Sequence, residues 1–460
     1  MLATVAETRA AERTVIEEYG IPVELLMERA ALGVAALTAQ IAKPNEPIAI
    51  LAGPGHNGGD AVACARILKG WGRSPQLFVT SAQLTPITEQ QLRWVRGWEV
   101  PVHDLASFRS APIIVDGIFG FGLNRAPQGE LADAIRQTNT ADARAIIAID
   151  LPSGTHGDTG VAPGERIVAT HTMATGLVKA GTVMDPALDA VGELWQADLG
   201  FPQSIIGQLA GSPIICTPPA PRPLNSHKGR FGTLLVVGGS RTMSGAPALA
   251  ALAAARSGVG MVIVGVPAAI RDVVAGLVPE ALVVPLSTSS EGCLTVAATG
   301  ELSPYLAKAE VLAIGPGLGL APATAELVMQ LHAKWDKPLV LDADALLPGL
   351  SATHAKRAVT ILTPHAGEAG RLLSASAMQI QADRLTAARS IAERYRACCV
   401  LKGGRTIVAL PDGHYGVNLR STPALATAGS GDVLTGLIGG LLAAGVGPFE
   451  AAVTGAFLQG

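Results

Sequence analysis

The chain is poor in charged and in aromatic side chains. Charged residues make up 15% of its 460 residues and aromatic residues 4%, against a typical charged share of ~25%. The 34 Lys and Arg nearly balance the 37 Asp and Glu, for a net charge of -3. No overall positive field would therefore attract nucleic acid or an anionic membrane surface. We expect neither of these partners, and we expect a core built mainly from aliphatic side chains.

Cysteine and long hydrophobic runs are also scarce. The five cysteines form an odd set without a CxxC pair, which argues against a disulfide framework and a cysteine zinc site. Charged residues such as Glu7, Arg9 and Glu12 stand where a signal peptide would need an apolar stretch. Only residues 433–449 resemble a membrane span, but they are fewer than the ~20 apolar residues required and contain glycines. We expect a buried helix there and a cytoplasmic protein.

Glycine and proline, in contrast, are frequent. The 53 Gly and 31 Pro lie between short apolar runs that alternate with helical stretches, which predicts parallel strands with helices on both faces. Four prolines within residues 218–223 predict a semi-extended linker. We expect two α/β domains, at 1–211 and 226–460, joined by a linker at 212–225. The expected strands are 48–52, 76–80, 113–116, 145–151, 233–238, 261–266, 311–315, 339–342, 359–363, 398–402 and 406–410, and the first expected helices are 61–70 and 83–97.

A glycine-rich segment, GPGHNGGD at residues 53–60, follows the first expected strand. A turn of this kind at the carboxyl end of a strand lets backbone N–H groups face an anion such as a pyrophosphate. The segment lacks the GxGxxG spacing of the general dinucleotide fingerprint. A tight turn without a ligand therefore remains an alternative.

Two further expected strands end in acidic residues. Asp116 opens DGIFGFGL at 116–123, and Asp150 opens DLPSG at 150–154. Carboxylates at the carboxyl ends of parallel strands converge on the crevice where open α/β sheets bind ligands, although each Asp could instead cap a helix. Asn57, Asp116 and Ser153 together offer hard oxygen ligands, which suit an alkali or alkaline-earth cation better than zinc.

These motifs, in this order and with GLVKAG at 176–181, resemble the NAD(P)H-hydrate epimerase domain of the YjeF N-terminal type. The resemblance covers about residues 15–201 and implies a Rossmann-like doubly wound sheet. It implies that a potassium ion is held by Asn57, Asp116 and Ser153. It also implies that the hydrated nicotinamide nucleotide contacts His56, Asn57, Gly58, Gly59, Asp60, Gly120, Phe121, Gly122, Leu123, Asn124, Arg125, Ala126 and Asp150.

Epimerisation at the hydrated carbon requires a group that accepts and returns a proton. Asp150, directly after an expected buried strand, is our candidate for this role. The alternative is that Asp150 only stabilises the turn at residues 152–154.

The strongest chemical signal of the second half is TAGSGD at residues 427–432, directly before the apolar helix expected from Val433. Glycines there free successive backbone N–H groups to converge on a developing phosphoryl charge, and the helix dipole adds to the attraction. Asp432 is placed to accept a proton from an attacking hydroxyl. Its alternative role is that of a helix cap.

Three other motifs end expected strands: IGPGLG at 314–319, TPHAGE at 363–368 and KGGRT at 402–406. KGGRT offers a cation, a donor and a hydroxyl to a phosphate, but many hairpins share this pattern. His365 either lines the site or has only a structural role.

With NSHKG at 225–229, Gly232 and SGA at 244–246, these motifs resemble the ribokinase-like superfamily and, within it, the ADP-dependent NAD(P)H-hydrate dehydratase. The resemblance implies a ribokinase-like α/β domain over about residues 225–460. It also implies ADP accompanied by Mg²⁺. Chains of this type usually continue a few tens of residues beyond the position of Gly460, so we expect a domain that is shortened at its C-terminus. The implied nucleotide contacts are Lys402, Gly403, Gly404, Arg405, Thr406 and Gly431, and the implied dinucleotide contacts are Ala246, Gly317, His365 and Asp432.

Both halves together predict a bifunctional repair enzyme for damaged NADH and NADPH. The first domain would interconvert the R and S hydrates, and the second would use ADP to dehydrate the S hydrate to NAD(P)H, AMP and phosphate. One alternative is a vitamin or sugar kinase fused to a nucleotide-binding module, and another is a first domain that binds without catalysing. We expect the hydrated nucleotides and ADP as partners, and a homo-oligomer.

Overall fold

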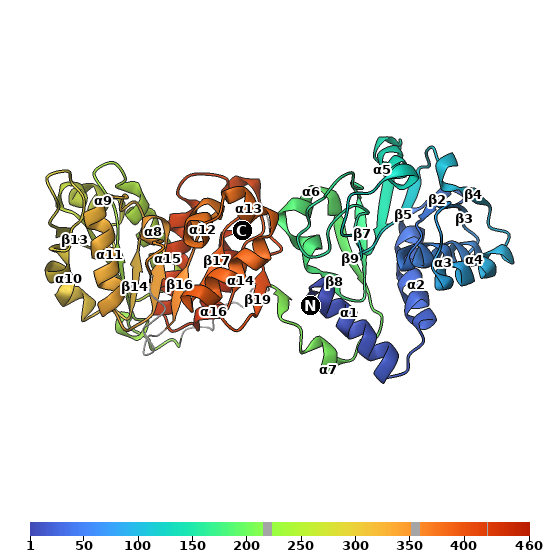
Figure 1. Cartoon of the computed structure of the whole chain (residues 1–460). Helices are drawn as coiled ribbons and strands as arrows, with labels where there is room; N and C mark the ends of the chain where they lie inside the picture. The colour runs from blue at the N-terminus through green and yellow to red at the C-terminus, as the bar shows by residue number, and fades with distance from the viewer. Residues whose placement is uncertain (215–222, 351–358, 421) are drawn as a thin grey trace. The chain divides into compact units, whose positions relative to one another are not determined.

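The computed structural model describes residues 1–214, 223–350, 359–420 and 422–460 (Figure 1). The chain divides into two compact units, Met1–Ser212 and Pro213–Gly460. Most of the expected linker, residues 215–222, lies outside the described residues. Within the described ranges, no helix has both the length and the hydropathy needed to cross a membrane. Each unit is an α/β fold, so the predicted fold class is confirmed.

The first unit contains a seven-stranded sheet in the order β4-β3-β2-β5-β6-β7-β9, with all neighbours parallel. The chain therefore enters the sheet in its middle, goes to one edge and returns to build the other half, which is the doubly wound order of dinucleotide-binding sheets. The order reverses between β2 and β5, where such sheets bind ligands. The strands are β1 (Leu2–Ala3), β2 (Pro47–Ala52), β3 (Ser74–Val79), β4 (Val102–Asp104), β5 (Ile113–Gly117), β6 (Ala145–Ile149), β7 (His171–Thr175), β8 (Val178–Lys179), β9 (Glu193–Ala197) and β10 (Gly211–Pro213).

Helices cover both faces of this sheet. Ile48 and Ile50 of β2 pack with α2 and α3 on one face, while Ala49 and Leu51 pack with α5 on the other, as the alternation of side chains along a strand requires. Burial on both faces explains why the strands are nearly continuous apolar runs. The helices are α1 (Val5–Arg13), η1 (Thr14–Glu18), α2 (Val23–Ile41), α3 (His56–Gly70), α4 (Pro86–Arg96), η2 (Leu105–Ser107), α5 (Gly129–Thr140), η3 (Ala180–Val183), η4 (Asp185–Ala187), α6 (Leu188–Val191) and α7 (Gln203–Ile206).

One expected boundary in this unit is wrong. Helix α3 begins at His56 and not at Ala61, so residues 56–60 form its first turns and not a loop. Gly58 makes this possible, because a Cβ there would overlap the backbone carbonyl of Gly53. The glycines of the motif therefore bring the start of the helix close to the end of β2.

In the second unit the strand order is β13-β12-β11-β14-β15-β16-β17-β18-β19. Neighbours are parallel as far as β17, and β17, β18 and β19 are antiparallel. The strands are β11 (Thr233–Val237), β12 (Met261–Pro267), β13 (Leu282–Leu286), β14 (Val311–Ile314), β15 (Leu339–Leu341), β16 (Thr360–Leu362), β17 (Cys398–Leu401), β18 (Ile407–Ala409) and β19 (Tyr415–Val417).

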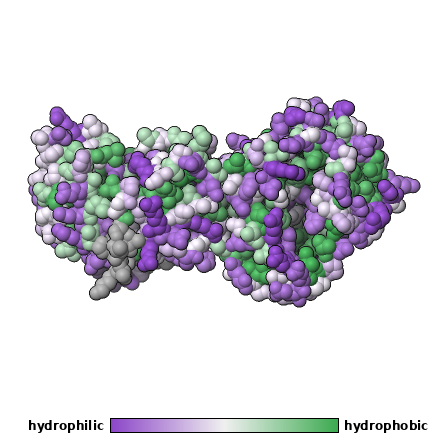
Figure 2. Space-filling view, viewed as in Figure 1, coloured by the Kyte–Doolittle hydropathy of each residue, from purple (hydrophilic) through white to green (hydrophobic). Residues whose placement is uncertain are grey.

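The helices of the second unit include α8 and α15, which pack with Leu234 and Val236 in its main hydrophobic cluster. On the face drawn in Figure 2, hydrophilic residues lie between small hydrophobic areas in both units. The helices are η5 (Lys228–Arg230), α8 (Gly245–Ser257), η6 (Ala268–Ile270), α9 (Arg271–Leu277), α10 (Ala298–Leu306), α11 (Pro322–Lys334), η7 (Ala343–Ala345), α12 (Ala366–Leu373), α13 (Ala377–Ala382), α14 (Arg384–Tyr395), η8 (Pro423–Leu425), α15 (Ser430–Ala443) and α16 (Pro448–Gln459).

The single helix expected over residues 433–449 is also corrected. Helix α15 begins three residues earlier, at Ser430, and ends at Ala443. Gly445 then adopts a left-handed φ of 92°, and Pro448 starts α16 at its first position, where proline is well tolerated. Asp432 therefore lies inside the first turn of α15 and not before it.

Candidate active sites

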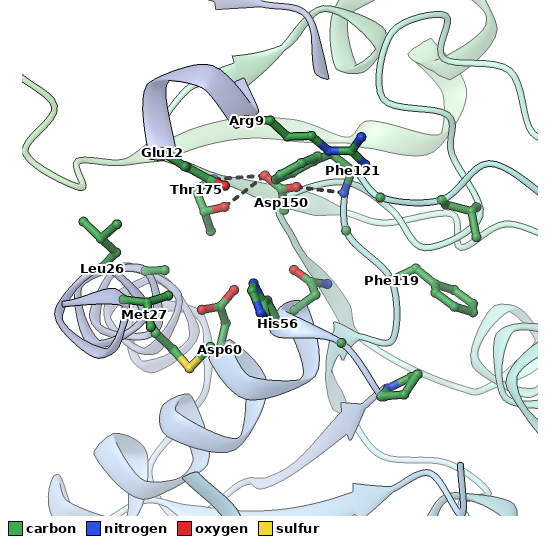
Figure 3. A pocket seen from close by; sticks show the side chains of 18 of the residues that line it. Arg9, Glu12, Leu26, Met27, His56, Asp60, Phe119, Phe121, Asp150 and Thr175 are labelled. Atoms are coloured by element: carbon green, nitrogen blue, oxygen red, sulfur yellow. Dashed lines mark hydrogen bonds between the residues drawn. The ribbon is translucent and has the colours of Figure 1, made fainter. Parts of the chain in front are cut away.

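The first unit contains a pocket of about 900 Å³ beside the start of α3 (Figure 3). This volume lies within the usual range for small-molecule sites. Gly58, Gly59 and Ala126, which the sequence resemblance also implied, do not line it. The implied residues that do line the pocket are His56, Asn57, Asp60, Gly120, Phe121, Gly122, Leu123, Asn124, Arg125 and Asp150.

Asp150 follows β6 and is held from three directions. Its Oδ1 accepts hydrogen bonds from Lys179 Nζ at 2.5 Å and Thr175 Oγ1 at 2.9 Å, and its Oδ2 accepts one from the backbone N–H of Phe121 at 3.1 Å. Lys179 is fully buried, so the two charges compensate each other inside the protein. Lys179 belongs to the GLVKAG motif, but the sequence pattern did not predict this ion pair.

Two more carboxyl groups face the same pocket. Burial, with Asp150 and Glu12 nearby, raises the pKa of Asp60 well above its usual range. Burial also raises the pKa of Glu12, against the effect of Lys179. Figure 3 shows Glu12 beside Thr175 and Asp150, with Asp60 across the open space. Glu12 belongs to α1, whose place at the site was not predicted from the sequence.

The three candidate cation ligands lie in the interior near this pocket. Ser153 donates to Asp116 twice, from Oγ to Oδ1 at 2.6 Å and from its backbone N–H to Oδ2 at 2.9 Å. Burial raises the pKa of Asp116 to about 6, although its hydrogen bonds from Ser153 act in the opposite direction. The buried Nδ2 of Asn57 has no hydrogen-bond partner among the described residues.

This donor set suits a monovalent cation. It combines one carboxylate with neutral amide and hydroxyl oxygens, which are hard ligands. In the part of the chain that the structure describes, no group of three or more His, Cys, Asp or Glu side chains has the arrangement of a metal site. One carboxylate among neutral oxygens would match a cation of single charge.

In the second unit, residues that follow three adjacent parallel strands meet at one carboxylate. Asp342 follows β15, Thr363 follows β16 and Lys402 follows β17. Oδ1 of Asp342 accepts from Lys402 Nζ and from Thr363 Oγ1, both at 2.7 Å. Oδ2 accepts from Thr435 Oγ1 of α15, also at 2.7 Å. Asp342 thus ties the end of the sheet to the first turns of α15.

Asp432 lies beside this centre, in the first turn of α15. Burial and the nearby Asp342 raise the pKa of Asp432 to about 6, against the effect of Lys402. Burial alone would lower the pKa of Lys402, but Asp342 and Glu368 keep it above its usual value. Lys402 Nζ lies only 3.1 Å from the place that a Cβ on Gly431 would take. The structure therefore brings together Lys402, Gly431 and Asp432, which the sequence motifs had named separately.

The other implied residues of this unit fall into two groups. Ala246 and Gly317 are neighbours, because a Cβ on Gly317 would lie 3.0 Å from that of Ala246. His365 caps α12, with Nδ1 accepting from the backbone N–H of Gly367 at 2.9 Å. Its capping role is the structural alternative that the sequence left open.

The turn between β17 and β18 holds Gly403, Gly404, Arg405 and Thr406. The buried Arg384 side chain stabilises this turn by donating hydrogen bonds to the carbonyls of Leu401 at 3.2 Å and Arg405 at 3.1 Å. A Cβ on Gly403 would overlap the Arg384 guanidinium. The glycine at this position therefore allows the turn to close over the buried arginine.

Comparison with known proteins gives matches for both units. A family model described as YjeF-related protein N-terminus matches residues 23–181, and one described as NAD(P)H-hydrate dehydratase matches residues 234–460. A bifunctional NAD(P)H-hydrate repair enzyme of Moorella thermoacetica is 37% identical over all of this chain and 91% of its own. One of Gloeobacter violaceus is 41% identical over 95% of this chain and 88% of its own.

Among solved structures, an ADP/ATP-dependent NAD(P)H-hydrate dehydratase of Bacillus subtilis, crystallised with ATP and Mg²⁺, is 32% identical, with a TM-score of 0.45. The match covers 52% of this chain and 82% of that one. The full-length relatives confirm the resemblance stated from the sequence motifs. The chain belongs to the family of bifunctional NAD(P)H-hydrate repair enzymes.

Proposed function

We propose that this chain repairs hydrated NADH and NADPH in two steps. An epimerase domain at residues 1–211 interconverts the R and S hydrates, and a dehydratase domain at 226–460 converts the S hydrate and ADP into NAD(P)H, AMP and phosphate. The observation that carries this proposal is a buried carboxylate held opposite a lysine in each unit, Asp150 with Lys179 and Asp342 with Lys402. Asp150 and Lys179 belong to the DLPSG and GLVKAG motifs of the epimerase resemblance, and Lys402 belongs to the KGGRT motif of the dehydratase resemblance.

In the epimerase domain, Asp150 is the proposed proton acceptor. Moving the hydroxyl to the other face of the ring requires one proton to be delivered and one removed. The hydrogen bonds from Lys179, Thr175 and Phe121 fix the orientation of the carboxylate. The pocket around it is large enough to enclose a nucleotide.

Potassium is the proposed resident cation of this domain. Asn57, Asp116 and Ser153 would hold it, and it would supply a fixed positive charge opposite the Asp116 carboxylate. Ser153 Oγ also accepts a hydrogen bond from the backbone N–H of Phe119 at 2.8 Å. The site residues thereby order the loop that continues to Phe121 at the pocket.

In the dehydratase domain, Asp432 is the proposed general base. It takes the proton of the substrate hydroxyl as that oxygen attacks the terminal phosphorus of ADP, and AMP leaves. Lys402 and the backbone N–H of Gly431 lie beside the place where negative charge develops. Loss of phosphate from the esterified carbon, with loss of a ring proton, then restores the dihydronicotinamide.

Mg²⁺ is the proposed companion of ADP, where it would neutralise charge on the nucleotide. Asp344 and Glu368 both act electrostatically on Asp432, so further carboxylates lie near the proposed base. The implied nucleotide contacts at residues 402–406 and at Gly431 belong to this proposal. So do a cytoplasmic location, where NAD(P)H is used, and a homo-oligomeric state.

One time course tests both steps. Mixed epimers of hydrated NADH are incubated with ADP, Mg²⁺ and K⁺, and the nucleotides are separated by HPLC. We expect both epimers to disappear with the wild-type chain and only the S epimer to disappear with Asp150→Asn. Unchanged hydrates together with phosphorylation of a vitamin alcohol such as hydroxymethylpyrimidine would favour the kinase alternative instead.

A further inference from the structure

Helix α1 forms one wall of the epimerase pocket, although the matched family model begins only at residue 23. Arg9, Glu12 and Ile16 all line the pocket. Their spacing of three and four residues places them on one face of the helical segment. Ala11 and Val15, on the opposite face, are buried in a hydrophobic cluster. The segment therefore presents the polar side chains of Arg9 and Glu12 to the pocket, and Ile16 both lines the pocket and packs against the cluster.

The position of this helix is fixed by the residues that precede it. Strand β1 pairs in parallel with β8, with Ala3 opposite Lys179. Thr4 and Glu7 form a capping box at the start of the helix, and the backbone N–H of Val5 donates to Asp158 Oδ1 at 2.6 Å. Arg9 is consequently presented from a rigid element and not from a free terminal segment.

Charge is unevenly distributed around the pocket. The carboxyl groups of Glu12, Asp60 and Asp150 gather on one part of its lining, and the lysine beside them, Lys179, is already paired with Asp150. Arg9 extends along Phe121 (Figure 3), with its guanidinium carbon over the Phe121 ring, 6.0 Å from its centre. Among the residues that the structure describes, no carboxylate lies within ion-pair distance of Arg9. Arg9 lowers the pKa of the nearby Glu12 carboxyl electrostatically but forms no ion pair with it. A cation in this position, at the rim of a nucleotide-sized pocket, is suited to an anion.

We propose that Arg9 binds a phosphate group of the dinucleotide and that helix α1 is thereby part of the epimerase site. This inference rests on the proposed function of the first unit. Two phosphates have the required chemistry: the pyrophosphate bridge, which both hydrates carry, and the 2′-phosphate, which only hydrated NADPH carries. The Glu12 side chain, one turn further along the helix, then faces the reacting end of the substrate near Asp150.

The test compares R-to-S exchange by the wild-type chain and by Arg9→Gln, with hydrated NADH and hydrated NADPH as separate substrates. We expect KM to rise about ten- to a hundredfold, with kcat changed less than about twofold, because one charge-assisted contact to the substrate is lost. An equal rise for both substrates assigns the pyrophosphate. A rise for hydrated NADPH alone assigns the 2′-phosphate.

Two further variants separate a contact from a general charge effect. Arg9→Lys should recover part of the lost affinity, because it keeps the positive charge but not the bidentate geometry. Arg13→Gln removes the same charge from an exposed position of α1 that does not line the pocket, and its KM should equal that of the wild type. An unchanged KM in Arg9→Gln, or an equal rise in Arg13→Gln, would overturn the proposal.

A binding measurement keeps this proposal separate from the proposed function. Calorimetric titration of the full chain with NADP⁺ needs no turnover, and any binding by the second unit is common to all variants. If the wild-type chain does not exchange epimers, the proposed function fails. The Arg9 proposal is then supported if Arg9→Gln loses binding that Arg13→Gln retains, and it is overturned if the two titrations coincide.

Discussion

The rate of dehydration should rise with pH as Asp432 loses its proton. Burial raises the pKa of Asp432 to about 6, and a general base acts only in its ionised form. The rate should therefore climb about tenfold per pH unit well below pH 6 and level off above it. At about pH 5, roughly a tenth of the Asp432 side chains would be ionised, which predicts a rate roughly tenfold below the plateau.

Stability should move in the opposite direction over the same interval. The folded-state pKa of Asp432 exceeds its ordinary value of 3.8, so the folded state binds more protons than the unfolded state between these two values. The contribution of this group to the free energy of unfolding is then present at lower pH and is lost as the pH rises through 6. Titration of Asp432 therefore cannot lower the rate at pH 5 by unfolding the protein.

The assay follows the return of dihydronicotinamide absorbance from pure S hydrate and ADP between pH 5 and 8. Asp432→Asn keeps the shape of the side chain and removes the base, which should cost ~10²-fold or more. Asp412→Asn, a change at an exposed carboxylate of the same unit, should leave the profile unchanged, and epimer exchange in the same sample reports whether the first unit is folded. A flat profile from pH 5 to 7, or an Asp432→Asn variant with a tenth of wild-type activity, would refute this reasoning.

Three other changes test the rest of the chain. Asp342→Asn removes the nearer of the two buried carboxylates beside Lys402 and leaves Glu368 at 3.7 Å. Urea titration should show a loss of about 1.5–3 kcal/mol in the free energy of unfolding, with a higher KM for ADP; wild-type stability would contradict the assigned network. Asp116→Asn should slow epimer exchange and abolish its dependence on K⁺ without changing dehydration of pure S hydrate, whereas equal losses in both assays would indicate unfolding. Gly58→Ala should destabilise the fold by about 1–3 kcal/mol and lower the midpoint of thermal unfolding, because the added Cβ would overlap a backbone carbonyl. Gly55→Ala is the control: nothing lies within 4 Å of its Cβ, so the midpoint should change much less.

The central strands could be predicted closely from the sequence. Residues 48–52 and 311–315 were expected as strands and are Pro47–Ala52 and Val311–Ile314, because parallel strands buried on both faces are continuous apolar runs. β7 and β9 were not expected. Their sequences, HTMAT and ELWQA, are mixed in polarity, and they become strands by pairing with neighbours already in the sheet.

Some residues of the candidate sites could likewise be predicted from the sequence, and others could not. Residues in glycine-rich motifs, such as Asp150 and Asp432, could be found from the sequence because glycine marks the turn that exposes them. Asp342 could not, because no such motif surrounds it and its bond to Thr435 spans 93 residues. Arg9 was overlooked for a related reason, since helical spacing shows which residues share a face but not what that face contacts.

Asp150 also has an unusual backbone, with a left-handed φ of 70°. Asn tolerates this region better than Ala does, and β-branched residues are strongly disfavoured there. Alanine at this position would therefore add backbone strain of about 1 kcal/mol to the loss of the carboxylate, and its activity would overstate the chemical role of the side chain. The same restriction acts on natural variation: a descendant that lost the epimerase reaction but kept the fold should carry Asn or Gly at position 150, and not Val or Ile.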